Sequence, residues 1–283
     1  MKLLLWYRRA AQVIACLMFF SVFQVADAAT RPGRVVVTGV KGIAEYQVRG
    51  EVAWHQAKVG MVLAEGVSLK TGKAASVDLA FVTGAIARMA GGTSVSIDRL
   101  TEETNGLPQP ANRPIGRTEM TLHRGRLMTE VAKQTPGSIF RVHTPEGDIN
   151  VKGTQLIITY DSTTGQFTLA VPEGSVTLTL PGGQTITVTA GNQISGTYYP
   201  TTGQVTVTQP TPVPMDPAFS QFLADNTNSG IRELVINSTG PIDLDAVIRA
   251  AIAAAGRTGN ATIVVIPNIT NPTTVSPSVP ASP

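Results

Sequence analysis

Short runs in which apolar and polar residues alternate, with glycine between them, constrain the fold of this chain more than any other feature. An alternation with a period of two is typical of β-strands that bury one face. Threonine fills many of the outward positions, where a β-branched side chain suits the pleated surface. Because such runs recur along most of the chain, we predict a mainly β fold, either a β-sandwich or a β-roll with a solenoid-like stack of strands. The clearest runs lie at residues 77–81, 94–97, 156–160 and 176–180.

Two breaks in this pattern divide the chain. A proline-rich stretch at residues 101–117 predicts a surface loop, and closely spaced prolines at residues 210–217 predict a stiff, extended linker. Beyond it, Asp216 precedes a proline as a helix N-cap does, residues 244–252 have helical spacing, and residues 263–266 form an apolar, strand-like run. We therefore expect a β-rich region at residues 29–209, a separate small α/β appendage at 218–266, and a disordered Pro/Thr/Ser tail at 267–283.

The N-terminus has the layout of a secretory signal peptide. Basic residues precede an apolar run at residues 10–25, and small residues follow at Ala26 and Ala28. Signal peptidase requires small side chains at these two positions. We therefore predict that residues 1–28 form a signal peptide, that cleavage leaves Ala29 as the new N-terminus, and that the protein is periplasmic, secreted or held at the cell surface.

Two other interpretations of this segment stay open. A retained membrane anchor would place the protein in the membrane, although the apolar run is shorter than the roughly 20 residues that span a bilayer. Lipidation at Cys16 is the other alternative, although the most apolar stretch follows this cysteine instead of preceding it. If cleavage occurs, the mature protein keeps no stable membrane span.

Composition limits the chemistry of the mature chain. Its single cysteine, Cys16, would leave with the signal, so we expect neither disulfides nor thiol chemistry. The formal net charge of the whole chain is only +3 and no basic cluster occurs, which argues against nucleic acid as a partner.

The sequence offers little support for an enzyme. His55, His123 and His143 lie in separate segments without metal-ligand spacing. Asp148 and Glu173 could meet as paired carboxylates, but each adjoins a glycine, as solvated acids in turns do. No nucleophile elbow, phosphate loop or dinucleotide fingerprint is present. We expect no catalytic residue, no metal and no cofactor.

Aromatic residues give a weaker signal. They could line a sugar-binding face, whereas burial in the core or at a strand edge is the alternative interpretation. The residues concerned are Tyr46, Trp54, Tyr198 and Tyr199.

Four short motifs occur in a fixed order within the strand-rich region. A strand leads into a Thr-Pro turn, which is followed by a Val-Lys-Gly-Thr step, a Glu-Gly-x-Val turn and a closing Ala-Gly-Asn-Gln. Their chemistry suggests architecture, because proline ends strand pairing and glycine permits turns and close approach. The motif residues are Thr144, Pro145, Val151, Lys152, Gly153, Thr154, Glu173, Gly174, Val176, Ala190, Gly191 and Gln193.

This order of motifs resembles the periplasmic FecR domain over about residues 50–193. Lys152 stands out as a charge between two motif positions. In well-known members, the resemblance implies a sensor that responds to an outer-membrane receptor and controls a cytoplasmic sigma factor through a helical segment ahead of a membrane span. Here nine residues precede the apolar run, which is too few for a sigma-binding segment.

We therefore expect an exported FecR-domain protein that acts as a non-catalytic binding module for an envelope protein or a surface polymer. The alternative is a membrane-held FecR-like regulator coupled to an outer-membrane receptor and a sigma factor.

Overall fold

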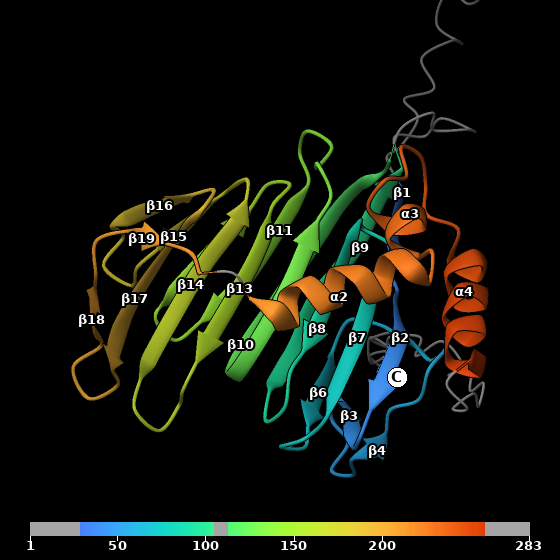
Figure 1. Cartoon of the computed structure of the whole chain (residues 1–283), viewed down its shortest axis with the longest axis horizontal. Coiled ribbons are helices and arrows are strands. Elements are labelled where there is room, and N and C mark those ends of the chain that lie inside the picture. Colours follow the sequence, from blue (N-terminus) through green and yellow to red (C-terminus); the bar gives the residue numbers. More distant parts are fainter. Residues whose placement is uncertain (1–28, 105–112, 215, 258–283) are drawn as a thin grey trace, which may run out of the picture.

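The computed structural model describes residues 29–104, 113–214 and 216–257 (Figure 1). Strands account for 51% and helices for 14% of the structure, which confirms the predicted mainly β fold. The elements are β1 (Ala29–Pro32), β2 (Val35–Lys41), β3 (Ala44–Val48), β4 (His55–Gln56), β5 (Val62–Leu63), β6 (Val67–Thr71), β7 (Ser76–Phe81), β8 (Ala85–Met89), β9 (Ser94–Thr104), β10 (Ile115–Val131), β11 (Ile139–Thr144), β12 (Gly147–Val151), β13 (Gln155–Tyr160), β14 (Gln166–Glu173), β15 (Ser175–Thr179), β16 (Thr185–Thr189), β17 (Asn192–Tyr199), β18 (Gln204–Val207), β19 (Thr211–Pro212), α2 (Pro217–Asn228), α3 (Ile231–Val235) and α4 (Leu244–Arg257).

The strands form two layers that share β10. Sheet A runs in the order β4, β3, β6, β9, β10, β11, β12, β15 and β16, with β1 beside the second half of β9. Sheet B runs β5, β2, β7, β8, β10, β13, β14 and β17, with β18 and β19 along the outer edge of β17. The pairings are antiparallel except for β10 with β11, which is parallel.

Strand β10 passes from sheet A to sheet B at Gly125. Its first part, up to Arg124, pairs with β9, and the rest pairs with β8 and β13. Gly125 has a φ of +92°, and a Cβ there would lie 2.5 Å from the Thr93 Cα. Only glycine fits this bend, because the backbone conformation and the close approach both exclude a side chain.

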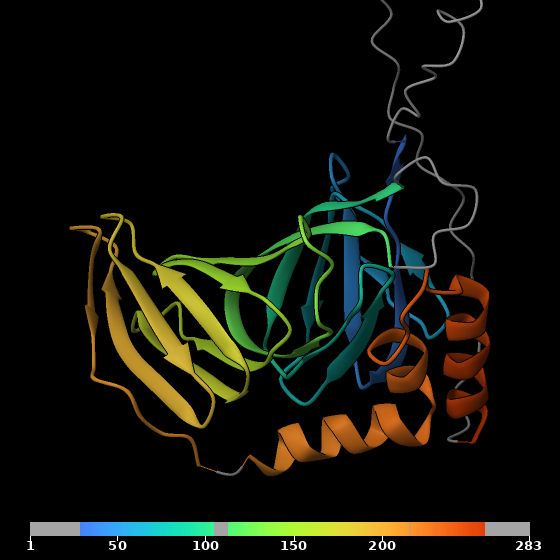
Figure 2. The same cartoon turned by 90° about the horizontal axis from the view of Figure 1, so that it is seen from above.

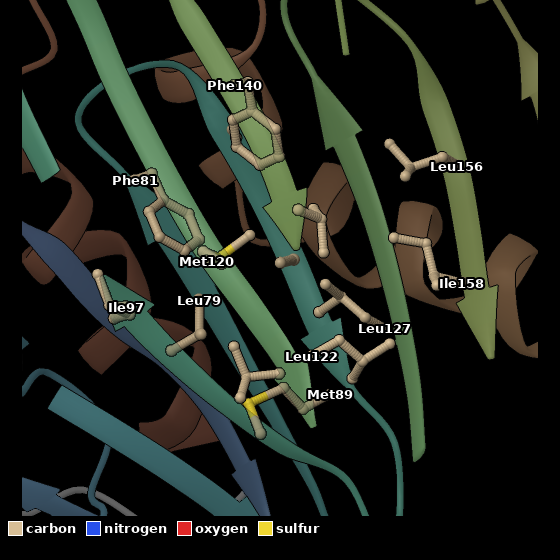
Figure 3. Packing of buried hydrophobic residues seen from close by; sticks show 14 of the residues in the cluster. Leu79, Phe81, Met89, Ile97, Met120, Leu122, Leu127, Phe140, Leu156 and Ile158 are labelled. Atoms are coloured by element: carbon tan, nitrogen blue, oxygen red, sulfur yellow. The ribbon is translucent and has the colours of Figure 1, made fainter. Parts of the chain in front are cut away.

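The main core lies between the two sheets (Figure 3). Strands such as β6 and β11 alternate buried and half-buried side chains, as the period of two predicts. Phe81 of sheet B and Phe140 of sheet A meet edge to face, with ring centroids 6.4 Å apart. This geometry is favourable for aromatic pairs, and the contact joins the two layers.

A second apolar cluster covers the opposite side of sheet B, where the helices pack (Figures 1 and 2). Asp216 begins α2 as predicted, because its Oδ1 accepts hydrogen bonds from the amides of Ala218 and Phe219 at 3.0 and 3.1 Å. The strands of sheet B contribute Val36, Ala80, Ile86, Met128, Ile157 and Ala170, the turn before β5 contributes Val59, and the helices contribute Phe219, Phe222, Ile231, Val235, Val247, Ala251 and Ala255.

Ion pairs reinforce this apolar contact. Arg126 pairs with Asp216, Arg88 with Asp225 at 2.8 Å, and Arg232 with Glu130 at 2.6 Å. Each pair joins sheet B to α2, its N-cap or α3. The helical segment shares an apolar core with the β body, since it covers a face of sheet B; the division of the chain into separate units stays a prediction.

Two local predictions need adjustment. The predicted loop at 101–117 is too long, because β9 continues to Thr104 and β10 begins at Ile115. The predicted linker at 210–217 includes β19, which pairs with β17. The strand expected at 263–266 and the tail expected at 267–283 lie outside the described residues, and the proposed domain boundaries stay predictions.

A chain ending at Gln209 should be poorly soluble, because removal of the helices exposes apolar side chains of sheet B such as Val36, Ile86 and Met128. We expect binding of a hydrophobic dye and loss of a cooperative thermal transition. The control is a chain ending at Arg257, which keeps every described helix. If the Gln209 truncation stays soluble with an unchanged melting temperature, the shared core contributes nothing.

Candidate functional site

The Val-Lys-Gly-Thr step and the Glu-Gly-x-Val turn meet in space. At the first, the chain crosses from β12 in sheet A to β13 in sheet B, and at the second it returns from β14 to β15. The Thr154 hydroxyl donates to the Ser175 carbonyl at 2.9 Å, while its backbone exchanges hydrogen bonds with Val131 at 2.9 and 3.0 Å. Thr154 thus ties both crossings to the end of β10.

Glycine is required where these crossings touch. Gly153 and Gly174 have φ values of +67° and +85°. A Cβ on Gly174 would lie 2.8 Å from the Gly153 carbonyl oxygen, and one on Gly153 would lie 3.0 Å from the Lys133 Cα. Gly153 and Gly174 therefore permit close packing of the two crossings.

The other motif residues differ in burial. Lys152 and Glu173 are exposed, and no ion pair of Lys152 is found within the described ranges. Gly191, which follows Ala190, donates its amide to the Val171 carbonyl and accepts from the Val213 amide, both at 2.8 Å. Gln193 pairs with Thr211 of β19. Val151 and Val176 are buried and face each other between β12 and β15.

The Thr-Pro turn holds a feature that sequence reasoning missed. Thr144 donates its hydroxyl to the Gly147 carbonyl at 2.7 Å, and Glu146, which follows Pro145, is only 1% exposed. Neither carboxylate oxygen of Glu146 makes a well-formed hydrogen bond within the described part of the chain. Burial raises the pKa of Glu146 to about 7, against weaker opposing effects of its own backbone N–H and the Thr144 hydroxyl.

The histidines lie on separate strands of sheet A. His143 lies 2.7 Å from Asp148 and 3.5 Å from Glu119, whereas the Nε2 of His123 lies 2.7 Å from the Ser96 hydroxyl. Across the ranges that the structure covers, no group of three or more His, Cys, Asp or Glu side chains is arranged to hold a metal. Asp148 belongs to sheet A and Glu173 to sheet B, so these two acids do not form a carboxylate pair.

The aromatic candidates do not form one face. Tyr46 lies against His55 with ring centroids 5.4 Å apart, and the Lys70 ammonium lies 4.0 Å from the centre of the Trp54 ring. These contacts are at the β3–β4 end of sheet A. Tyr198 and Tyr199 belong to β17, at the other end of the molecule (Figure 1).

A cavity of about 650 Å³ lies between sheet B and the helices. At its wall, Arg88 donates to both Asp78 oxygens at 2.6 and 2.7 Å and to Asp225 at 2.8 Å. Burial alone would lower the pKa of Arg88, but its bonds to the two carboxylates raise it above its ordinary value. The Asp78–Arg88 pair could have been found from the sequence, since the two face each other across the β7–β8 hairpin. Asp225 is too distant in sequence for such a prediction.

Comparison with known families gives a result that fits this architecture. Residues 67–177 match the family model described as "FecR protein". This segment of the chain matches a FecR domain. The match runs from β6 to β15 and includes both crossings, whereas Ala190, Gly191 and Gln193 lie beyond it. The wider boundary at residues 50–193 stays a prediction.

Two solved structures are similar to this chain, each described as a "putative anti-sigma factor" from Parabacteroides distasonis. The first is 16% identical, with a TM-score of 0.38 over 50% of this chain and 59% of that chain. The second is 13% identical, with a TM-score of 0.39 over 67% of this chain and 91% of that chain. No curated protein matches the sequence. Within the described residues, no helix is long and apolar enough to cross a membrane.

Two motif glycines allow the role of the FecR-domain crossings to be tested. Gly174→Ala and Gly191→Ala both place a side chain at a positive φ, +85° and +76°, but only Gly174 has atoms within 4 Å of the new Cβ. Backbone strain should cost about 1 kcal/mol in both variants. Gly174→Ala should lose roughly 1–3 kcal/mol more through overpacking, measured by urea unfolding. Equal losses would refute the close packing of the crossings.

Glu146 should make stability depend on pH. An unfolded glutamate ionises near 4.5 and the folded one near 7, so the free energy of unfolding falls as pH rises between these values and the penalty is complete above 7. Glu146→Gln removes this penalty, which is on the order of 3 kcal/mol. We therefore expect the stability of the variant relative to wild type to rise between pH 5 and pH 8 in urea unfolding.

The matched control for this measurement is Glu173→Gln, because Glu173 is exposed. Burial also raises the pKa of Glu102 to about 7, with Arg31 and Arg113 opposing it, but Glu102 is unchanged in every variant and its contribution cancels in the difference. A pH-independent difference between Glu146→Gln and wild type would show that Glu146 is solvated.

Proposed function

We propose that this protein is an exported, non-catalytic FecR-domain module of the cell envelope that acts in regulation by binding another protein. The match over residues 67–177 supports the family role, and the predicted signal peptide supports export. The observation that carries the binding role is the exposure of the large apolar side chains Ile43 and Val52, which flank β3 at this end of sheet A. Together with Trp54 and Lys70, which contact each other nearby, they are here called the β3–β4 patch.

The β3–β4 patch combines features that favour protein contact. Ile43 is 65% and Val52 is 93% exposed, and the Gln47 side chain donates to the Val52 carbonyl at 2.9 Å, which holds the loop against the strand. Lys70 lies over Trp54 and also pairs with Glu45 at 3.1 Å. Aromatic and aliphatic groups ringed by charges are typical of interface centres.

The patch suits a protein better than a surface polysaccharide. Sugars bind by stacking on open aromatic faces, but one face of the Trp54 ring is covered by the Lys70 ammonium. Ile43 and Val52 offer aliphatic surface without hydroxyl partners, which suits apolar side chains of a partner. The helices cover the outer side of sheet B, so the patch lies on the sheet that they leave free.

Val52→Asp should abolish capture of the partner from a detergent-solubilised envelope fraction, because it places a charge in the patch. Tyr199→Asp is the control, since Tyr199 is 46% exposed but lies on β17. With the captured protein purified, titration calorimetry should show a Kd at least about tenfold weaker for Val52→Asp and for Trp54→Ala. Equal affinities for all variants would exclude the patch. N-terminal sequencing of the purified protein tests export, and Ala29 is the expected first residue.

A further inference from the structure

The last five strands of the sandwich carry no charged side chain. From residue 174 to residue 215 the sequence contains no Asp, Glu, Lys, Arg or His, although charged residues make up 14% of the whole chain. This stretch forms β15 to β19, which lie together at one end of the molecule (Figure 1). Exposed sheet edges normally carry charges or prolines that prevent pairing with another strand. The end formed by β15 to β19 therefore lacks the charges that normally protect an exposed sheet edge.

Strand β16 is the edge of sheet A at this end. Within the described residues it pairs with β15 and with no other strand. The amide of Leu180 donates to the Gln184 carbonyl at 2.8 Å, which makes this a hydrogen-bonded pair. Because such pairs alternate along an antiparallel ladder, Thr185, Thr187 and Thr189 direct their backbone N–H and C=O groups away from β15, and all three residues are exposed.

The sequence of β16 is nearly symmetric about its centre. It reads Thr-Ile-Thr-Val-Thr, with Thr187 in the middle. If two such strands pair antiparallel about Thr187, each threonine meets a threonine and Ile186 meets Val188. Thr185, Thr187 and Thr189 then fall at the hydrogen-bonded positions of the new ladder. The Thr189 carbonyl also accepts a hydrogen bond from the Asn192 side chain at 3.4 Å, so the central Thr187 pair carries the contact.

We propose that two copies of this chain associate edge to edge through β16, antiparallel about a two-fold axis at Thr187, so that their A sheets form one continuous sheet. This contact is isologous, as in most closed dimers. Val188 is fully buried and Ile186 partly buried on the core side, so pairing would extend the apolar layer across the axis. On the outer side, threonine pairs favour cross-strand contact, and no like charges meet.

The opposite end of sheet A is less suited to this contact. Its edge strand β4 has two residues, and the adjoining strands carry a Glu45–Lys70 ion pair. Strand β18, the neighbouring edge in sheet B, reads Gln-Val-Thr-Val and has no such symmetry. The inference uses neither the β3–β4 patch nor the identity of a partner, so it stands apart from the proposed function.

A charge test addresses the two-fold axis. Thr187→Lys and Thr187→Glu should each be monomeric in sedimentation velocity over a concentration series in which wild type dimerises, because identical charges meet at the axis. Mixing the two variants should restore a dimer. Thr206→Lys, on exposed β18, should dimerise like wild type. A monomeric wild type, dimers of both single variants, or dissociation by Thr206→Lys alone would each overturn the proposal.

Cross-linking gives an independent check of the register. Opposed residues of a hydrogen-bonded antiparallel pair have Cα atoms about 5.5 Å apart, within the range that a disulfide spans. In a Cys16→Ser background, Thr187→Cys should form a disulfide-linked dimer under oxidation, and Thr206→Cys should not. Thr187→Cys that stays monomeric on oxidation, with normal circular dichroism, would contradict pairing about Thr187.

Discussion

Burial of the outer face of sheet B is the interaction on which the rest of the structure depends. That sheet is apolar on both sides, so it needs the interlayer core on one face and the helices on the other. The ion pairs of Arg88, Arg126 and Arg232 hold the helices in one position on the sheet. Sheet A keeps a polar outer face and carries the exposed surfaces from which binding is inferred.

The sequence predicted the β architecture well because alternation is a local signal. It missed the helical cover for a reason that is visible in particular strands. Residues 35–37 of β2 and 85–87 of β8 are apolar without interruption and fully buried. Such runs are typical of strands buried on both faces, and a search for alternating residues does not detect them. The apolar faces of α2 and α4 are the surfaces that cover these strands.

In the candidate site, too, local features could be predicted and contacts between distant segments could not. Motif residues such as Gly153, Thr154 and Gly174 could be assigned to architecture from glycine and turn chemistry, and their contacts agree with that assignment. Contacts between distant segments could not be predicted, because no local pattern relates Arg88 to Asp225 or Glu130 to Arg232. The buried state of Glu146 was also hidden, since an acid beside a glycine normally suggests a solvated turn.

Strand β10 has a consequence for how the molecule responds to force. Its backbone is continuous through Gly125 and is hydrogen-bonded to β9 and β11 in one layer and to β8 and β13 in the other. Neither layer can slide or separate from the other without disrupting the hydrogen bonds of β10. A pull on sheet A is therefore shared with sheet B and with the helices behind it, so the domain behaves as a single stiff body. A stiff domain transmits a displacement applied at one end to the other end with little internal deformation.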